Sequence, residues 1–169
     1  MAADQTLTIH CACGRVAIEA RGAPLLNAAC YCDDCQAAAA QIESLPHAPA
    51  VKGADGGTEY MLFRKDRMSR GRGAELLRPH KLREGSPTTR WVASCCNSAM
   101  YLGFDDAKHW VDIYRTRLTD ERPPLDMRVS TRFKPAGVVI PDDVPQYPGY
   151  PFGFILKLIG ARFAMMFGG

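Results

Sequence analysis

Alternation of apolar and polar residues predicts short β-strands at the start of the chain. Residues 6–10 (TLTIH) and 15–20 (RVAIEA) both alternate in this way, and residues 11–14 (CACG) lie between them. A period of two is typical of a strand with one buried face. A glycine after the second cysteine suits a turn that needs a positive φ. The pattern therefore predicts a hairpin with two cysteines in its turn.

The middle of the chain predicts further strands. Strand-length apolar segments are separated there by Gly, Pro, Ser or Asp, and they cover residues 58–64, 75–82, 88–94, 99–104 and 109–115. Such segments are rich in the branched and aromatic residues that favour sheets. The fold is therefore predicted to be mainly β.

A short helix and a loop are predicted before these segments. Residues 36–45 (QAAAAQIESL) are strong helix formers and predict a helix that begins near Asp33 or Asp34. Cys35 would lie in its first turn, where the helix dipole lowers a thiol pKa. Residues 46–57 are rich in Pro, Ala, Gly and Asp and predict a loop. Its GADGG sequence indicates a tight turn, since no Lys-Ser or Lys-Thr follows as in a phosphate-binding loop.

The chain changes character after Pro135, which divides it into a β domain at 1–135 and a tail at 136–169. The tail is first rich in Pro and Gly, and then apolar from 152 to 169 with only Lys157 and Arg162 charged. The apolar part predicts a helix packed on its own sheet or on a second copy of the chain. A membrane-surface anchor is the alternative. The stretch is too short and interrupted for a membrane span.

Composition indicates an ordinary folded protein. A chain of 169 residues can bury a core without staples, and 47% hydrophobic with 23% charged residues excludes a disordered chain. The formal net charge of +3 excludes no partner. The amino terminus has no basic region followed by an apolar run, so no secretory signal is predicted and a cytoplasmic location is expected.

All seven cysteines fall in three clusters, and this pattern indicates metal. The clusters are Cys11 and Cys13; Cys30, Cys32 and Cys35; and Cys95 and Cys96. Zinc needs several sulfurs within about 2.3 Å of one point, and closely spaced cysteines supply them. Disulfides are disfavoured by the odd number, the tight spacing and the expected reducing compartment.

The first and third clusters predict a closed structural zinc site of four thiolates, Cys11, Cys13, Cys95 and Cys96. Adjacent residues on a strand point to opposite faces, so Cys95 and Cys96 can share one metal only if the backbone turns sharply. Asn97-Ser98 favours such a turn. If only one of the pair binds, Cys96 is preferred.

The middle cluster offers Cys30, Cys32 and Cys35 with no obvious fourth ligand, which is typical of a catalytic zinc with one open position. Asp33 and Asp34 are candidate hydrogen-bond or proton acceptors there, or solvated residues that cap the helix. His10 is a candidate substitute ligand for the first site, or a strand histidine packed beside it. The other three histidines have no supporting spacing.

A basic segment runs from Arg64 to Arg83, with eight Lys or Arg residues against two acidic ones. A groove lined by these side chains would attract an anion. The segment lacks interleaved aromatic residues, so nucleic acid is not the expected partner, and a solvated basic face is the simpler interpretation.

The motifs CACGRVAIEA, ACYCDDC and a later Cys-Cys turn followed by MYLGF resemble the glutathione-dependent formaldehyde-activating enzyme family, which includes the centromere protein V group. The resemblance covers residues 7–115. It implies a β-tent fold with one structural zinc and a second, catalytic zinc. In family enzymes the second zinc is linked to the condensation of glutathione with formaldehyde to S-hydroxymethylglutathione.

Carried over by position, Cys11, Cys13 and Cys96 match structural ligands, and Cys30, Cys32 and Cys35 match the catalytic set. Three positions depart from the family pattern. Tyr31 replaces a histidine, Ala93 replaces the first cysteine of the third motif, and Asn97 replaces a glycine. Cys95 is the nearby thiol that can compensate for Ala93.

The resulting hypothesis is a zinc-dependent carbon–sulfur lyase-type enzyme that acts on a glutathione-like thiol adduct. Its zinc binds a small thiol as the thiolate, and arginines of residues 64–83 hold the thiol's carboxylates. The alternative is a non-catalytic zinc-stabilised module whose basic face binds a nucleic acid or an acidic protein. A redox or metal-buffer role is a third interpretation.

Overall fold

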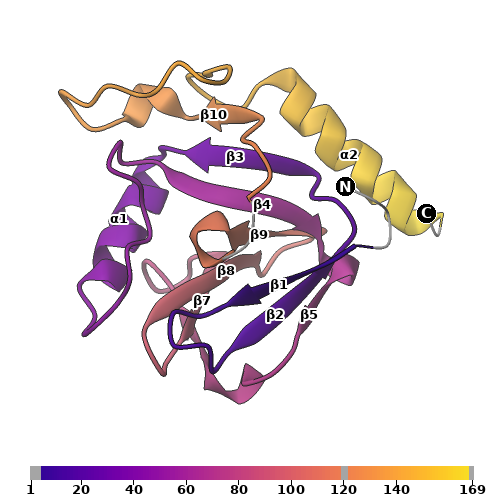
Figure 1. Cartoon of the computed structure of the whole chain (residues 1–169). Helices are drawn as coiled ribbons and strands as arrows, with labels where there is room; N and C mark the ends of the chain where they lie inside the picture. The colour runs from indigo at the N-terminus through magenta and orange to yellow at the C-terminus, as the bar shows by residue number, and fades with distance from the viewer. Residues whose placement is uncertain (1–4, 119–121, 168–169) are drawn as a thin grey trace.

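The computed structural model describes residues 5–118 and 122–167 (Figure 1). Residues 1–4, part of the stretch predicted to lack a secretory signal, and 168–169, the end of the predicted tail helix, lie outside this range. The elements, joined in places by short 3-10 turns, are β1 (Thr6–His10), β2 (Ala17–Arg21), β3 (Leu26–Cys30), α1 (Asp33–Glu43), β4 (Thr58–Arg64), β5 (Met68–Arg70), β6 (Leu77–His80), β7 (Thr88–Ala93), β8 (Ser98–Phe104), β9 (Trp110–Tyr114), β10 (Met127–Val129) and α2 (Phe152–Met166).

The described strands form two sheets, so the prediction of a mainly β fold is confirmed. A three-stranded sheet has the order β1-β2-β5, and a seven-stranded sheet has the order β10-β3-β4-β9-β8-β7-β6. Neighbouring strands are antiparallel except β10, which pairs in parallel with β3. The predicted cysteine hairpin is β1 and β2, and the five predicted middle segments correspond to β4, β6, β7, β8 and β9.

The seven-stranded sheet is buried on both faces, and β4 illustrates the division. Met61 and Phe63 pack in a core between the two sheets. Tyr60 and Leu62, which alternate with them, pack in a second core with residues of α1 and α2. Figure 1 shows the small sheet against the large one, with α1 and α2 at opposite sides of the view. The helices therefore cover the face that the small sheet leaves open.

Helix α2 packs on the large sheet along one stripe. Phe154, Leu158 and Ala161 are buried, and the Leu158 carbonyl lies 2.7 Å from Nε2 of His109. In the structure, Phe154 and Leu158 pack in the second core of the chain's own large sheet. The opposite face exposes large apolar side chains, and its contact with a second copy stays a prediction. None of the described helices has the length and apolar character needed to span a bilayer.

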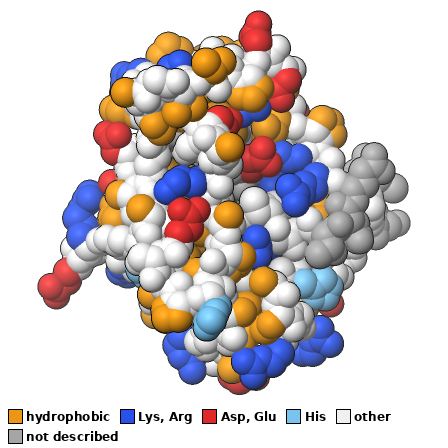
Figure 2. Space-filling view, turned by 60° about the vertical axis from the view of Figure 1, so that its left-hand side comes forward, with side chains coloured by type: hydrophobic (Ala, Val, Ile, Leu, Met, Phe, Trp, Pro, Cys, Tyr) orange, Lys and Arg blue, Asp and Glu red, His pale blue; other side chains and the backbone are white. Residues whose placement is uncertain are grey.

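The basic segment at residues 64–83 does not form a uniform cationic face. Arg64 pairs with Asp66, Lys81 with Asp105 and Arg83 with Asp34. Arg70 stacks on the Trp91 ring at 3.9 Å and donates to the Tyr101 hydroxyl at 2.7 Å. On the face seen in Figure 2, basic side chains lie among acidic and apolar ones over the middle and gather at the lower end.

Candidate metal centres and the adjoining cavity

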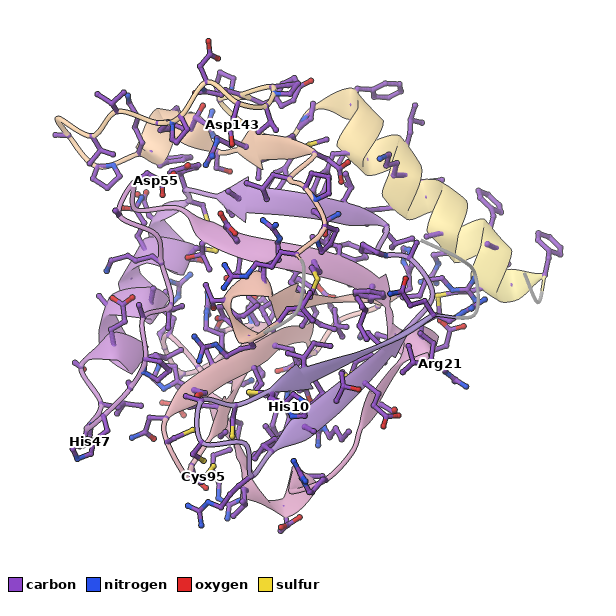
Figure 3. The ribbon with its side chains drawn as sticks, viewed as in Figure 1. His10, Arg21, His47, Asp55, Cys95 and Asp143 are labelled. Carbon is purple, nitrogen blue, oxygen red and sulfur yellow. The ribbon has the colours of Figure 1, made fainter. Side chains whose placement is uncertain are left out.

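Four sulfur atoms from two hairpin turns meet at one point. Cys11 and Cys13 lie between β1 and β2, and Cys95 and Cys96 lie between β7 and β8. The Sγ atoms are 3.6 Å apart for Cys11 and Cys13, 3.4 Å for Cys13 and Cys95, and 3.8 Å for Cys11 and Cys95. All four sulfurs lie within 4.8 Å of one another. Figure 3 labels Cys95 at this end of the molecule. We call this group the four-cysteine site.

The distances in the four-cysteine site fit a tetrahedral zinc ion. Bonds of about 2.3 Å from zinc to sulfur put the sulfurs about 3.8 Å apart. Backbone groups hold both turns in place: the N–H of Val16 donates to the Cys11 sulfur at 3.2 Å, and the N–H of Ala12 donates to Ser98 Oγ at 2.9 Å. The site can therefore hold one metal ion with four thiolates.

Both members of the adjacent pair reach the site because the backbone turns sharply after them. Asn97 has a φ of 52°, in the left-handed region that asparagine tolerates better than most residues. Ala93 is buried at the end of β7 with none of its surface exposed, and Cys95 brings the additional sulfur. The geometry gives no reason to prefer Cys96 over Cys95.

One thiol of the four-cysteine site is already acidic. The N–H of Arg15 bonds to the Cys13 sulfur, and Cys95 adds a second hydrogen bond, so the pKa of the Cys13 thiol is lowered to about 6. Thiolate, not thiol, is the form that binds metal. Cys13 is therefore mostly a thiolate at neutral pH and can bind a metal ion without first losing a proton. His10 is not part of either cysteine group in the described residues.

The middle cluster forms a second group, which we call the cysteine triplet. Cys30 ends β3, and Cys32 and Cys35 begin α1, with the Cys35 N–H bonded to the Cys32 carbonyl at 3.0 Å. The three sulfurs lie within 4.8 Å of one another, and no described His, Asp or Glu joins them. The triplet can therefore hold a metal ion with three thiolates and leave one position open.

The two aspartates inside the cluster are solvated but do not cap the helix. Asp33 and Asp34 are exposed in the first turn of α1, and Cys32 occupies the cap position without a side-chain cap bond. The interpretation of the aspartates as caps is therefore wrong. Their charges still lie near the positive end of the helix dipole, where they are favourable.

Hydrogen bonds within the triplet separate the acidities of its thiols. Cys30 and Cys35 share hydrogen bonds with the Cys32 sulfur, and these lower the pKa of the Cys32 thiol to about 3, with help from the positive charge of Arg90. The bond with Cys32 raises the pKa of Cys30 to about 12, and bonds with Cys30 and Cys32 raise the pKa of Cys35 above its usual value. Metal binding by the triplet must therefore release protons.

A cavity of about 360 Å³ adjoins the triplet, and one face of the large sheet forms its floor. Neighbouring strands supply side chains in register: Leu62 pairs with Asp112, Asp112 with Leu102, and Leu102 with Arg90. All four line the cavity, with the triplet and α2 forming further walls. The volume is in the range of small-molecule sites.

The basic side chains of the cavity are not those that the sequence predicted. None of the arginines at residues 64–83 lines it, so the prediction that they hold a substrate carboxylate beside the triplet is wrong. The cavity takes Arg90 and Lys108 instead. Arg90 is 2% exposed and donates to the Asp34 carbonyl at 3.2 Å. The sequence signal for this residue was an arginine inside the predicted strand TTRWVA, where a charged side chain is rarely buried without a function or a partner.

Asp112 is the second unexpected residue. It lines the cavity between two leucines, and its Oδ1 has no hydrogen-bond partner in the described structure. Burial raises the pKa of its carboxyl group to about 7, against the opposing charges of Arg90 and Lys108. The folded protein therefore keeps a proton that the unfolded chain releases near pH 3.8.

Asp112→Asn is expected to stabilise the protein at pH 8 relative to wild type, and to leave stability nearly unchanged at pH 4. Between these values the folded state binds more protons than the unfolded state, so wild-type stability falls as pH rises through this range. The expected gain at pH 8 is on the order of 4 kcal/mol, since folding raises the pKa from 3.8 to about 7. Urea denaturation of both proteins at both pH values measures it, and equal differences at pH 4 and pH 8 would contradict the assignment.

Tyr31 points away from the triplet into a buried polar cluster. Its hydroxyl donates to Asp55 Oδ2 at 2.6 Å and accepts from Arg128 at 2.7 Å. Arg128 also pairs with Asp55 at 3.0 Å and with Asp143 at 3.0 Å. Figure 3 shows Asp55 and Asp143 at the same end of the molecule, opposite Cys95. Tyr31, one of the three positions that depart from the pattern, therefore helps to link the loops of Asp55 and Asp143 to β10.

The fold and the two groups define a class of protein: a mainly β chain with one closed four-cysteine site and one three-cysteine site that adjoins a cavity. The chain belongs to the glutathione-dependent formaldehyde-activating enzyme family, whose model matches residues 6–132.

Among solved structures, a Rhodobacter sphaeroides protein determined by structural genomics is similar to this chain. It is 16% identical, with 69% of this chain and 92% of that chain covered and a TM-score of 0.48. No curated protein matches the sequence.

Proposed function

We propose that this protein is a zinc-dependent enzyme that forms or breaks a carbon–sulfur bond between a small thiol and an aldehyde. The reaction takes place at Cys30, Cys32 and Cys35, in a zinc-binding β-tent fold whose four-cysteine site holds a structural zinc. One observation carries the proposal: the triplet has three described ligands and borders a cavity, whereas the other group has four. An incomplete ligand set beside a cavity is typical of a catalytic metal.

A zinc ion held by the triplet would supply a position where a thiol binds as its thiolate at neutral pH. The chain's own groups surround that position. The Tyr60 hydroxyl lies 3.6 Å from the Cys35 sulfur, and the Tyr150 hydroxyl lies 4.0 Å from the Cys30 sulfur. Both hydroxyls can donate hydrogen bonds that stabilise ligating thiolates. Arg90 adds a buried positive charge next to the helix terminus that holds the triplet.

The reaction needs no oxidant or reductant. In the forward direction the thiol sulfur bonds to the aldehyde carbon, and the thiol proton ends on the former carbonyl oxygen. The reverse reaction breaks the carbon–sulfur bond and returns that proton. Asp112 lies in the same cavity and keeps its proton up to a pH of about 7, so it can hold or release a proton there. The family description names glutathione and formaldehyde, so these are the first reactants to test.

The pairing of the basic segment favours this enzyme over a nucleic-acid-binding module. Arg64, Lys81 and Arg83 each pair with a carboxylate. Binding to phosphates would have to break these pairs, and a phosphate-binding surface gains its affinity from cations that release counterions.

The test is an assay of S-hydroxymethylglutathione formation, and of adducts of other small thiols, above the spontaneous rate. Cys32→Ser should reduce the rate to the spontaneous value while the circular dichroism spectrum stays unchanged. Ala37→Ser is the matched control, because Ala37 is exposed on the same helix and does not line the cavity, and it should keep the wild-type rate. No excess rate with any thiol, or full activity of Cys32→Ser, would overturn the proposal.

A further inference from the structure

The cavity beside the triplet has an apolar character that the motifs alone do not indicate. Its floor carries Leu62 and Leu102, and its rim carries Phe104 and Trp110. The Phe104 and Trp110 rings pack against each other with centroids 5.5 Å apart. These side chains can bind a ligand through van der Waals contacts and the burial of its apolar surface, but they offer it few hydrogen bonds.

Helix α2 adds a further apolar wall, which lies outside the family match at residues 6–132. Phe154 and Leu158 are 7% and 6% exposed and line the cavity together with Ile155, which is 41% exposed. The contact between the Leu158 carbonyl and His109 fixes the helix on the sheet. The tail therefore closes the cavity with aliphatic and aromatic groups.

Most of the charged side chains of the cavity are already neutralised. Arg90 and Lys108 are the basic residues that line it, and Asp34 and Asp112 are the acidic ones. The Lys108 ammonium already pairs with Asp106, and Arg90 donates to the Asp34 carbonyl. Asp34 pairs with Arg83, and Asp112 keeps its proton up to a pH of about 7. Arg90 is therefore the one lining charge to which the described residues supply no carboxylate partner. Three thiolates around a divalent ion would carry one net negative charge, which offsets that of Arg90. Glutathione carries two carboxylates and one ammonium, so it would meet no surplus of positive charge here.

We propose that the thiol bound at this site carries an apolar alkyl or aryl group and is not a charged peptide. This inference rests on the proposed function, because it assumes that a thiol binds at the triplet. Burial of an aromatic or aliphatic group against Leu62, Leu102 and α2 gains the free energy of desolvation. Burial of carboxylates without cationic partners costs free energy.

Titration calorimetry of the zinc-loaded protein with phenylmethanethiol and with glutathione tests the inference. Phenylmethanethiol should bind at least about tenfold more tightly, which corresponds to about 1.4 kcal/mol. Quenching of Trp110 fluorescence, in a Trp91→Phe background, shows whether the ligand lies in the cavity, because Trp110 lines the cavity and Trp91 does not.

A pair of variants on α2 makes the test specific. Ile155→Arg places a cation on the cavity wall and should lower the preference for phenylmethanethiol over glutathione by about tenfold or more. Leu156→Arg is the matched control, because Leu156 is 49% exposed and does not line the cavity. It should keep the wild-type preference. Both positions are exposed, so neither substitution is expected to unfold the chain.

The outcomes separate the two proposals. If both thiols bind and glutathione binds as tightly or more tightly, the inference is wrong and the proposed function stands. An unchanged preference in Ile155→Arg would also overturn the inference. If the protein holds two zinc ions per chain and neither thiol binds, the proposed function fails and the inference fails with it.

Discussion

Replacing Cys11 with serine is expected to lower the midpoint of thermal unfolding by about 8–16 °C. A zinc ion at a free concentration a thousand times its Kd stabilises the folded state by about 4 kcal/mol. Each kcal/mol shifts the midpoint by about 2–4 °C in a chain of this size. Cys11 is 2% exposed and its sulfur contacts two other sulfurs of the site. Differential scanning calorimetry with and without a zinc chelator measures the effect.

The control for Cys11→Ser lies in the same turn. Ala12→Ser introduces the same hydroxyl at an exposed position that holds no sulfur, and it should change the midpoint by no more than about 2 °C. Wild-type protein stripped of zinc should unfold at or below the temperature of Cys11→Ser, because the chelator also removes the metal of the triplet. If Cys11→Ser has the wild-type midpoint, or if the chelator does not change the wild-type midpoint, no metal stabilises the two hairpins.

Arg128→Met is expected to cost about 2–3 kcal/mol of unfolding free energy, since it removes the arginine that donates to the buried Tyr31 hydroxyl and to the partly buried Asp55 carboxylate. Arg128 is 4% exposed. Its guanidinium binds Asp143 through two nitrogens at 3.0 and 3.1 Å, and it also contacts Asp55 and Tyr31. The midpoint of thermal unfolding should fall by about 4–12 °C.

Arg132→Met is the matched control for this prediction. Arg132 is exposed and stacks on the Phe133 ring at 4.6 Å, a contact worth about 1 kcal/mol or less. Thermal and urea unfolding of both variants measure the difference. If Arg128→Met and Arg132→Met have the same midpoint temperature and the same urea midpoint, the polar cluster around Tyr31 does not stabilise the protein.

Much of the fold could be predicted because the local pattern and the tertiary environment agree. In β1 the buried residues Leu7 and Ile9 alternate with more exposed ones, so the period of two is visible in the sequence. Strand β3 was missed because all five of its residues are buried and no alternation exists to detect. Strands β5 and β10 have three residues each, and only pairing with neighbours defines them.

The metal groups could be predicted because cysteine spacing is local and chemically specific. The cavity could not be predicted in the same way. Its floor depends on the register of β4, β9, β8 and β7, which the pattern within each strand does not reveal. Arg90 and Asp112 belong to it because of that register. The basic segment was a misleading signal, since its charge density says nothing about the carboxylates that pair with it.

Tyr31 shows where a motif comparison ends. The middle motif places it between two cysteines of the triplet, yet its hydroxyl contacts Arg128, which lies 97 residues away. Consecutive side chains of an extended backbone point in opposite directions. Position 31 therefore faces the loops, while positions 30 and 32 face the metal group. A change at this position therefore affects the buried polar cluster and leaves the three sulfurs in place.

The most direct test of the account is the zinc content per chain of purified protein, measured by mass spectrometry of the metal. The wild-type protein should hold two zinc ions. Cys30→Ser, Cys32→Ser and Cys35→Ser should each hold one and stay folded, since the four-cysteine site is separate. A wild-type content of one zinc that the triplet variants do not change, or a triplet joined by a disulfide with no metal, would contradict the account.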